Sequence, residues 1–205
     1  MPNIKQVLEP EKYYHIYNRG INSCDLFQEN ANYEHFLRLY EKYIDPIADT
    51  FAWVLMKNHF HLLVRIKSKV EIYKNLEGFE NLRGLKPEKR IYQQFSNLFN
   101  AYTKAFNKKY KRTGSLFESN FRRKLINNES YFKNIVVYIH NNPAHHGFCE
   151  HILDYPWSSY LTCISIKPTK LKRETVIGWF DDVANFKVLH NKNINFDEMN
   201  KFLDI

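Results

Sequence analysis

Several kinds of protein are excluded by what this sequence of 205 residues has little of. Its three cysteines, Cys24, Cys149 and Cys163, lie too far apart for a zinc ribbon or a disulfide framework. Residues 1–13 carry charges and no apolar core of signal-peptide length, and no apolar run elsewhere is long enough to span a bilayer. We therefore expect a cytoplasmic protein that is neither secreted nor embedded in a membrane.

Apolar and positively charged residues, by contrast, are plentiful. Hydrophobic residues make up 44% of the chain and aromatic residues 16%, enough apolar surface to offset the entropy lost on folding. A chain of this length is expected to form one main domain. The formal net charge of +8 favours a polyanionic partner such as nucleic acid, because each lysine or arginine placed on a phosphate releases bound counterions. Charge alone leaves an ordinary basic protein as an alternative.

The spacing of apolar residues predicts alternating strands and helices. Runs rich in aromatic and β-branched residues are the expected strands, at 13–19, 50–56, 58–66 and 116–126. Apolar residues three and four apart mark the expected helices, at 30–44, 91–106 and 130–142. Pro143 is expected to end the last helix, because the residue before a proline is pushed out of the helical region. Residues 67–90, with charges, glycines and a proline, predict a long mobile loop.

This order of elements indicates an α+β fold. We expect an antiparallel sheet with helices packed on one face and with the other face open for a ligand. Residues 1–150 are expected to form the main domain, and residues 151–205 to form a C-terminal extension packed on its core.

Two histidines alternate with apolar residues in one of the predicted strands. The two-residue period of a strand puts His59 and His61 on one face and Phe60, Leu62 and Val64 on the other. Neighbouring neutral imidazoles on a rigid strand can chelate a divalent ion. Two partly buried histidines held by hydrogen bonds would give the same pattern, so the pair by itself does not decide.

A tyrosine and an asparagine share one side of the last predicted helix. Tyr138 and Asn142 are four residues apart, a spacing that brings side chains to the same face. Tyr138 lies at the edge of the apolar stripe formed by Phe132, Val136 and Ile139, where a phenol can face a groove while its helix stays docked. A structural tyrosine would occupy the same place. Only the combination with the histidine pair is informative.

Basic residues gather between the second and third predicted helices, interleaved with aromatic residues. They are Lys104, Lys108, Lys109, Lys111, Arg112, Arg122, Arg123 and Lys124. This composition suits contact with phosphates combined with base stacking, and a solvated helix face beside ordinary core aromatics explains it equally well. Arg19, on the first strand, is expected to lie on the open sheet face.

Four further histidines lie between residues 139 and 152. A second metal site could be formed by His145, His146 and His151, although histidines in a loop are the simpler interpretation. His140 lies on the opposite side of its helix from Tyr138, so we expect it to take no part in catalysis.

Four separated motifs resemble, in the same order, those of the REP-associated tyrosine transposase family. They are MKNHFHLLV at 56–64, RTGSLF at 112–117, YIHNNPAHHG at 138–147 and YPWSSY at 155–160. The Trp179-Phe180 tail is also similar to that of many members. The resemblance covers most of the chain. One departure is Lys57, where many relatives place proline, which alters the hairpin turn and leaves the candidate ligands in place.

The resemblance implies a ferredoxin-like, RNA-recognition-like sheet that carries the family's HUH motif, two histidines around a hydrophobic residue. These fall on His59 and His61. The nucleophilic tyrosine of the family falls on Tyr138, and its third metal-binding side chain, one helical turn later, falls on Asn142.

The activity implied by this resemblance is that of a metal-dependent, single-stranded DNA endonuclease and strand transferase. It implies Mg²⁺ or Mn²⁺ as cofactor, a covalent 5′-phosphotyrosine intermediate, and single-stranded or hairpin DNA as partner of a monomer or homodimer. Imidazole and amide ligands alone do not distinguish these ions from zinc. Two alternatives stay open: a module that binds single-stranded RNA or DNA without cutting it, and a hydrolase that uses water as nucleophile.

Overall fold

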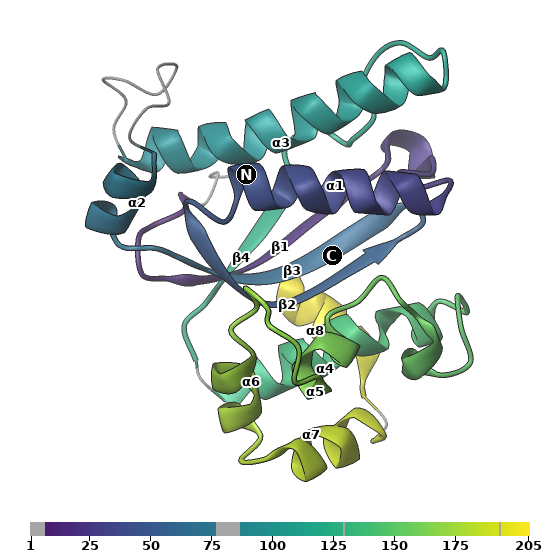
Figure 1. Ribbon diagram of the computed structural model, residues 1–205. Helices are drawn as coiled ribbons and strands as arrows, with labels where there is room; N and C mark the ends of the chain where they lie inside the picture. Colours follow the sequence, from purple (N-terminus) through teal and green to yellow (C-terminus); the bar gives the residue numbers. More distant parts are fainter. Residues whose placement is uncertain (1–6, 77–86, 129, 193) are drawn as a thin grey trace.

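The computed structural model describes residues 7–76, 87–128, 130–192 and 194–205. Four strands form an antiparallel sheet in the order β2-β3-β1-β4. The strands are β1 (Tyr13–Arg19), β2 (Ala48–Met56), β3 (His59–Ile66) and β4 (Arg122–Ile126). Helices lie on both sides of this sheet (Figure 1). No helix in the described part of the chain is long and apolar enough to cross a membrane.

One face of the sheet is covered by α1 (Asn30–Tyr43) and the long helix α3 (Pro87–Lys109) (Figure 1). Helix α1 connects β1 to β2, α3 precedes β4, and β2 and β3 form a hairpin. This connectivity, with β1 and β3 at the centre of the sheet, is the ferredoxin-like arrangement. The predicted α+β fold class is confirmed.

The second face of the sheet is not open. Helix α4 (Ser130–His145) lies across it, with α5 (Tyr160–Ile164), α6 (Arg173–Trp179) and α7 (Val183–His190) below (Figure 1). The last helix, α8 (Phe196–Leu203), is placed separately from these three. The apolar stripe of α4, with Val136 and Ile139 at 0% exposure, packs in one buried cluster with Val54 and Leu63 of the sheet. The prediction of an open face is wrong, because β2 and β3 are buried along both faces.

Part of the predicted mobile loop is a helix. Helix α2 (Lys69–Asn75) begins with a capping box, in which the Ser68 side chain accepts from the Glu71 backbone and the Glu71 carboxylate accepts from the Ser68 backbone. The sequence contains the Ser-x-x-Glu pattern of a capping box at Ser68 and Glu71, but the charged residues around it indicated a loop. Residues 77–86, also assigned to that loop, lie outside the described residues.

Two predicted boundaries are wrong. Of the strand expected over 116–126, only Arg122–Ile126 pairs continuously with β1, and Phe117 makes one isolated bridge to Gly20. Helix α4 does not stop before Pro143 but continues to His145. A proline inside a helix lacks an N–H bond and crowds the carbonyl four residues earlier, but α4 ends two residues after Pro143, and the Pro143 carbonyl still accepts from the Phe148 backbone at 2.8 Å. The continuation brings His145 and His146 close to the candidate site.

A buried polar chain joins α4 to the C-terminal helices. His190 donates through Nδ1 to the Phe186 carbonyl at 2.7 Å, so its Nε2 accepts from Nδ1 of His140 at 2.9 Å. His140 Nε2 then accepts from the Ser159 hydroxyl at 2.7 Å. His140 therefore faces away from Tyr138 and has a complete set of structural partners.

This histidine pair is expected to make the fold sensitive to acid. Burial lowers the pKa of His190 to about 4 and holds the pKa of His140 well below its ordinary value. Because both pKa values are depressed in the folded state, their stabilisation is complete above about pH 6.5 and is lost below it, at about 1.4 kcal/mol per pH unit for each histidine. Urea unfolding between pH 7.5 and 5 should show this loss, to which the other buried histidines with lowered pKa values, His15, His59 and His61, also contribute.

The control for this prediction is His151→Gln, which changes an exposed histidine and should leave the pH dependence as in the unaltered chain. A free energy of unfolding that stays constant between pH 7.5 and 5 would contradict the assignment of neutral, buried imidazoles.

Candidate metal and nucleophile site

The sheet presents two histidines to α4. His59 and His61 lie on the same face of β3, with ring centroids 5.3 Å apart. Tyr17 of β1 pairs with His61 in the strand register, and its ring lies 4.8 Å from the His61 ring. The phenol ring of Tyr138, on α4, lies 5.5 Å from the His61 ring. The structure thus brings a strand histidine pair and a helix tyrosine together across the interface of sheet and helix.

Asn142 lies one helical turn after Tyr138 on α4 and carries a buried oxygen. Its Nδ2 donates to the Tyr138 carbonyl at 2.9 Å, as one turn of helix permits. Its side-chain oxygen Oδ1 has no hydrogen-bond partner among the described residues, although Asn142 is 0% exposed. A buried acceptor without a partner costs free energy, and such an atom is expected where a ligand binds.

Both histidines of the pair are neutral. Burial, with smaller contributions from His146 and Arg19, lowers the pKa of His59 to about 3. Burial also holds the pKa of His61 well below its ordinary value. His59 Nδ1 lies 2.6 Å from Oδ1 of Asn58, to which it donates, so Nε2 keeps its lone pair. Neutral imidazoles with free lone pairs are the form that binds metal ions.

The donor set fits a divalent cation, because it combines two neutral imidazoles with the unpartnered amide oxygen of Asn142. Among the residues that the structure describes, no group of three or more His, Cys, Asp or Glu side chains is arranged to hold a metal. A site here therefore depends on the asparagine oxygen.

Tyr138 is protonated and covered. Burial raises the pKa of its phenol to about 12, and the side chain is 2% exposed. The cover is α8: the Tyr138 hydroxyl donates to Oδ1 of Asn200 at 2.7 Å, and the Phe196 ring lies 5.3 Å from the Tyr138 ring. The His145 ring also stacks on Phe196, with the two ring centroids 3.8 Å apart.

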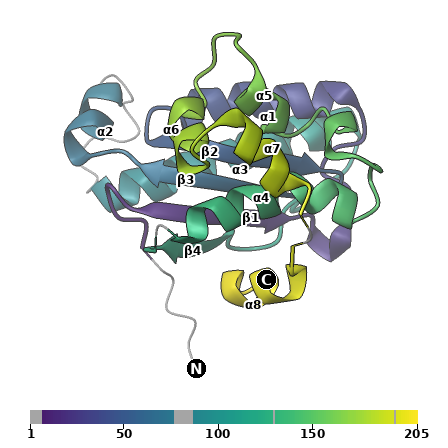
Figure 2. The ribbon, with the colours of Figure 1, turned by 90° about the horizontal axis from the view of Figure 1, so that it is seen from below.

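Helix α8 is also attached to the basic edge of the sheet. Figure 2 shows α8 beside β4, apart from α5, α6 and α7. Asp204 pairs with Lys124 at 2.6 Å, and its carbonyl accepts from Arg122 at 3.2 Å. Phe202 stacks on Tyr131 of α4 at 4.2 Å. The residues of α8 were not among the predicted site residues, because nothing in their local sequence marks a contact with Tyr138.

The predicted basic residues lie on one face of β4, on its opposite face, and outside β4. Arg122 and Lys124 pair with Tyr17 and His15 in the register of β4 and β1, which places them beside the site. Arg123 is on the other face, 4.9 Å from the ring of Phe121.

The remaining basic residues precede β4 in the sequence. Arg19 pairs in register with His59, and its side chain donates to Ser23 and approaches Glu118 at 3.5 Å. Lys104 lines a cavity of about 550 Å³ between α3 and residues 114–121. Of the others near the end of α3, Arg112 is held by Asn107 and the Ser115 carbonyl, and Lys108 and Lys111 are exposed.

Two histidines that sequence reasoning did not place in the site lie next to it. His15 of β1 is 1% exposed, and its Nε2 lies 3.0 Å from Nδ1 of His61. Burial lowers the pKa of His15 to about 3. The ring of His146, one residue past α4, lies 5.3 Å from that of His59. Strand alternation alone could have found His15, which has the same parity as Tyr17 opposite His61.

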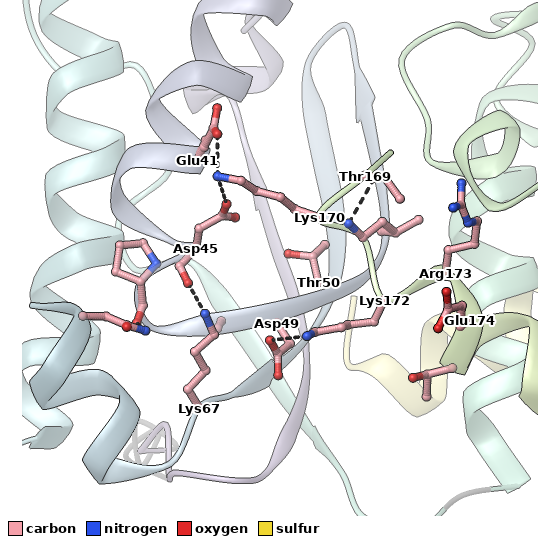
Figure 3. Close-up of a pocket in the computed structure, with 15 residues that line it drawn as sticks. Glu41, Asp45, Asp49, Thr50, Lys67, Thr169, Lys170, Lys172, Arg173 and Glu174 are labelled. Carbon is pink, nitrogen blue, oxygen red and sulfur yellow. Dashed lines mark hydrogen bonds and ion pairs between the residues drawn. The ribbon is translucent and has the colours of Figure 1, made fainter. Parts of the chain in front are cut away.

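The largest cavity described is elsewhere and shares no residue with the site. It has a volume of about 700 Å³ and lies between α1, β2 and residues 169–175 (Figure 3). Its charges neutralise one another: Lys170 contacts Glu41 at 2.5 Å and Asp45 at 3.0 Å, and Lys172 contacts Asp49 at 3.3 Å. These ion pairs tie the C-terminal region to α1, to the loop after it and to β2.

Comparison with known proteins gives two matches that bear on this site, while no family model matches the chain. A putative REP-associated tyrosine transposase of Haemophilus influenzae is 26% identical over 115 residues, which span 55% of this chain and 58% of that relative. A solved structure of a REP-associated tyrosine transposase bound to a REP hairpin superposes with a TM-score of 0.59 at 14% identity. It covers 82% of this chain and 89% of its own.

The fold and the site together define a class, a ferredoxin-like protein in which a strand histidine pair faces a tyrosine on a covering helix. The solved structure shares this fold. The resemblance of the chain to the REP-associated tyrosine transposases is confirmed, in sequence by the Haemophilus influenzae relative and in fold by the solved structure.

Proposed function

We propose that this chain is a transposase-like, metal-dependent endonuclease and strand transferase for single-stranded or hairpin DNA. The observation that carries the proposal is the approach of Tyr138 to His61 of the His59–His61 pair, with the unpartnered oxygen of Asn142 one helical turn after Tyr138. The hairpin bound by the solved relative is the kind of DNA we propose as partner.

His59, His61 and Asn142 would hold Mg²⁺ or Mn²⁺, which when bound stabilises negative charge on the scissile phosphate. Tyr138 is the nucleophile. Its oxygen bonds to phosphorus as the bond from phosphorus to the 3′ oxygen breaks, leaving a 5′-phosphotyrosine and a free 3′-hydroxyl. Because that hydroxyl can attack the same linkage, the step reverses and joins strands. With a pKa of about 12, the phenol is protonated at neutral pH and loses its proton to solvent during attack.

Arg19, Arg122 and Lys124 are the basic side chains placed to bind the backbone next to the scissile phosphate. The two residues of β4 are engaged by Asp204 of α8 in the structure. Strand binding at this edge of the sheet therefore requires α8 to give up these contacts.

A second candidate is a module that binds single-stranded RNA or DNA without cutting it. The observation in its favour is that Tyr138 is 2% exposed beneath α8. Catalysis needs this oxygen uncovered, whereas binding at the basic edge needs only that Asp204 release Arg122 and Lys124.

Divalent metal removal separates the two functions. Labelled single-stranded and hairpin fragments from beside the gene are incubated with the protein in Mn²⁺ or in EDTA, and binding and covalent capture are measured together. We expect a covalent protein–DNA band in Mn²⁺ that falls by at least about 100-fold in EDTA, because the cation supplies the charge stabilisation. Binding should change little. Equal binding with no covalent band in either buffer would instead support the binding module.

A further inference from the structure

A fourth buried group contacts the candidate metal site without belonging to its proposed ligand set. His15 lies on β1, diagonal to His61, since His61 pairs with Tyr17 and His15 pairs with Leu63 in the strand register. The two imidazoles lie 5.1 Å apart between ring centroids and are nearly parallel, at 26°. Nε2 of His15 and Nδ1 of His61 are 3.0 Å apart in a buried hydrogen bond. His15 is thus not one of the proposed metal ligands, but it contacts one of them, His61.

The direction of this hydrogen bond decides which ring nitrogen of His61 carries the lone pair. A neutral imidazole carries its proton on one nitrogen and its lone pair on the other. If Nδ1 of His61 donates to His15, the lone pair of His61 is on Nε2 and can bind a cation. If His15 donates instead, the proton of His61 lies on Nε2 and no lone pair faces outward. The direction of the hydrogen bond between His15 and His61 therefore decides whether His61 can bind a cation.

His59 shows the same arrangement with a different partner. Its Nδ1 lies 2.6 Å from Oδ1 of Asn58, an oxygen that can only accept. His59 therefore keeps its lone pair on Nε2. With His15 as acceptor, His61 is prepared in the same way, and the two ligands present the same type of nitrogen.

We propose that His15 is a positioning residue of the metal site, which accepts the Nδ1 proton of His61 and holds its Nε2 free for the cation. The inference rests on the proposed function. A metal-binding histidine is commonly oriented by an acceptor on its second nitrogen, and loss of that acceptor costs about 10 to 100-fold in metal affinity. An imidazole suits this position, because a carboxylate with 1% exposure would be a buried charge.

Metal binding tests the proposal without any activity measurement. Mn²⁺ is titrated calorimetrically into the full chain and into His15→Leu and His15→Gln. We expect His15→Leu to weaken binding by about 10 to 100-fold. His15→Gln, whose Oε1 can still accept, should bind within about threefold of the unaltered chain. The control is His35→Leu, which removes a half-buried histidine from α1 on the opposite face of the sheet and should leave affinity unchanged.

The tautomer gives a second readout that needs no metal. Two-bond ¹H–¹⁵N spectra of the apo protein should show the proton of His61 on Nδ1, and His15→Leu should abolish this preference. A proton on Nε2 of His61 in the unaltered chain would overturn the proposal.

The same titration separates this inference from the proposed function. If the unaltered chain binds Mn²⁺ and His15→Leu binds it equally well, the positioning role fails and the metal site stands. If the unaltered chain binds no Mn²⁺, the metal-dependent function fails and the positioning role fails with it.

Discussion

Replacing Tyr138 with phenylalanine should abolish the covalent protein–DNA band and leave DNA binding nearly intact. The substitution removes one oxygen and keeps the ring that packs beside His61 and Phe196. Without that oxygen no bond to phosphorus can form, so we expect adduct formation to fall by more than about 1000-fold, as the loss of a nucleophile does in other enzymes. Denaturing gels of labelled DNA give the adduct, and fluorescence anisotropy gives the dissociation constant, expected within about threefold of the unaltered chain.

The matched control is Tyr131→Phe, two turns earlier on α4. Tyr131 stacks on Phe202 and has no contact with the histidine pair in the structure, so its hydroxyl should be dispensable for the adduct. If Tyr138→Phe still forms the covalent band, the nucleophile is another residue, and Tyr138 is a structural tyrosine of the interface between sheet and helix.

Release of α8 should increase adduct formation. The Tyr138 hydroxyl is bonded to Asn200, and Lys124 and Arg122 are occupied by Asp204, so the nucleophile and the basic edge are covered by the same helix. One hydrogen bond contributes about 1 kcal/mol and an exposed ion pair up to about 1 kcal/mol, which together correspond to a gain of about 10 to 100-fold when the contacts are removed. A chain that ends at residue 194, and the double variant Asn200→Ala with Asp204→Lys, should both show the increase.

The control on the same helix is Lys201→Ala, an exposed residue of α8 outside these contacts, which should leave the rate unchanged. The double variant guards against loss of folding in the shortened chain, because it keeps the apolar contacts of Phe196 and Phe202. A folded variant that forms less adduct than the unaltered chain would show that α8 contributes to catalysis and does not restrain it.

Much of the fold could be predicted from local patterns. The period of two in residues 13–19 and 58–66 and the helical spacing in 30–44 are local properties of the chain, and each became the expected element. The covering of the second sheet face was missed, although β2 carries apolar residues on both of its faces. A strand without a polar face indicates burial on both sides, and this signal was present in Phe51, Val54 and Leu63.

The candidate site shows the same division between local and distant information. The spacing of His59 and His61 and of Tyr138 and Asn142 placed each pair on one face, and the structure brings Tyr138 next to His61. The cover by Asn200 could not be predicted, because it lies 62 residues from Tyr138 and the contact depends on how the C-terminal helices fold back. In β4, the alternation of side chains could have predicted that Arg123 lies on the opposite face of the sheet from Arg122 and Lys124.

The most direct test of the central claim is the identification of the residue that becomes attached to DNA. The protein is incubated with a single-stranded or hairpin substrate and Mn²⁺, digested with nuclease and protease, and analysed by tandem mass spectrometry. The proposed mechanism predicts a nucleotide 5′-phosphate on the peptide that contains Tyr138, and its absence when EDTA replaces Mn²⁺. Cleaved DNA with no attached peptide, or a phosphate on a different tyrosine, would contradict it.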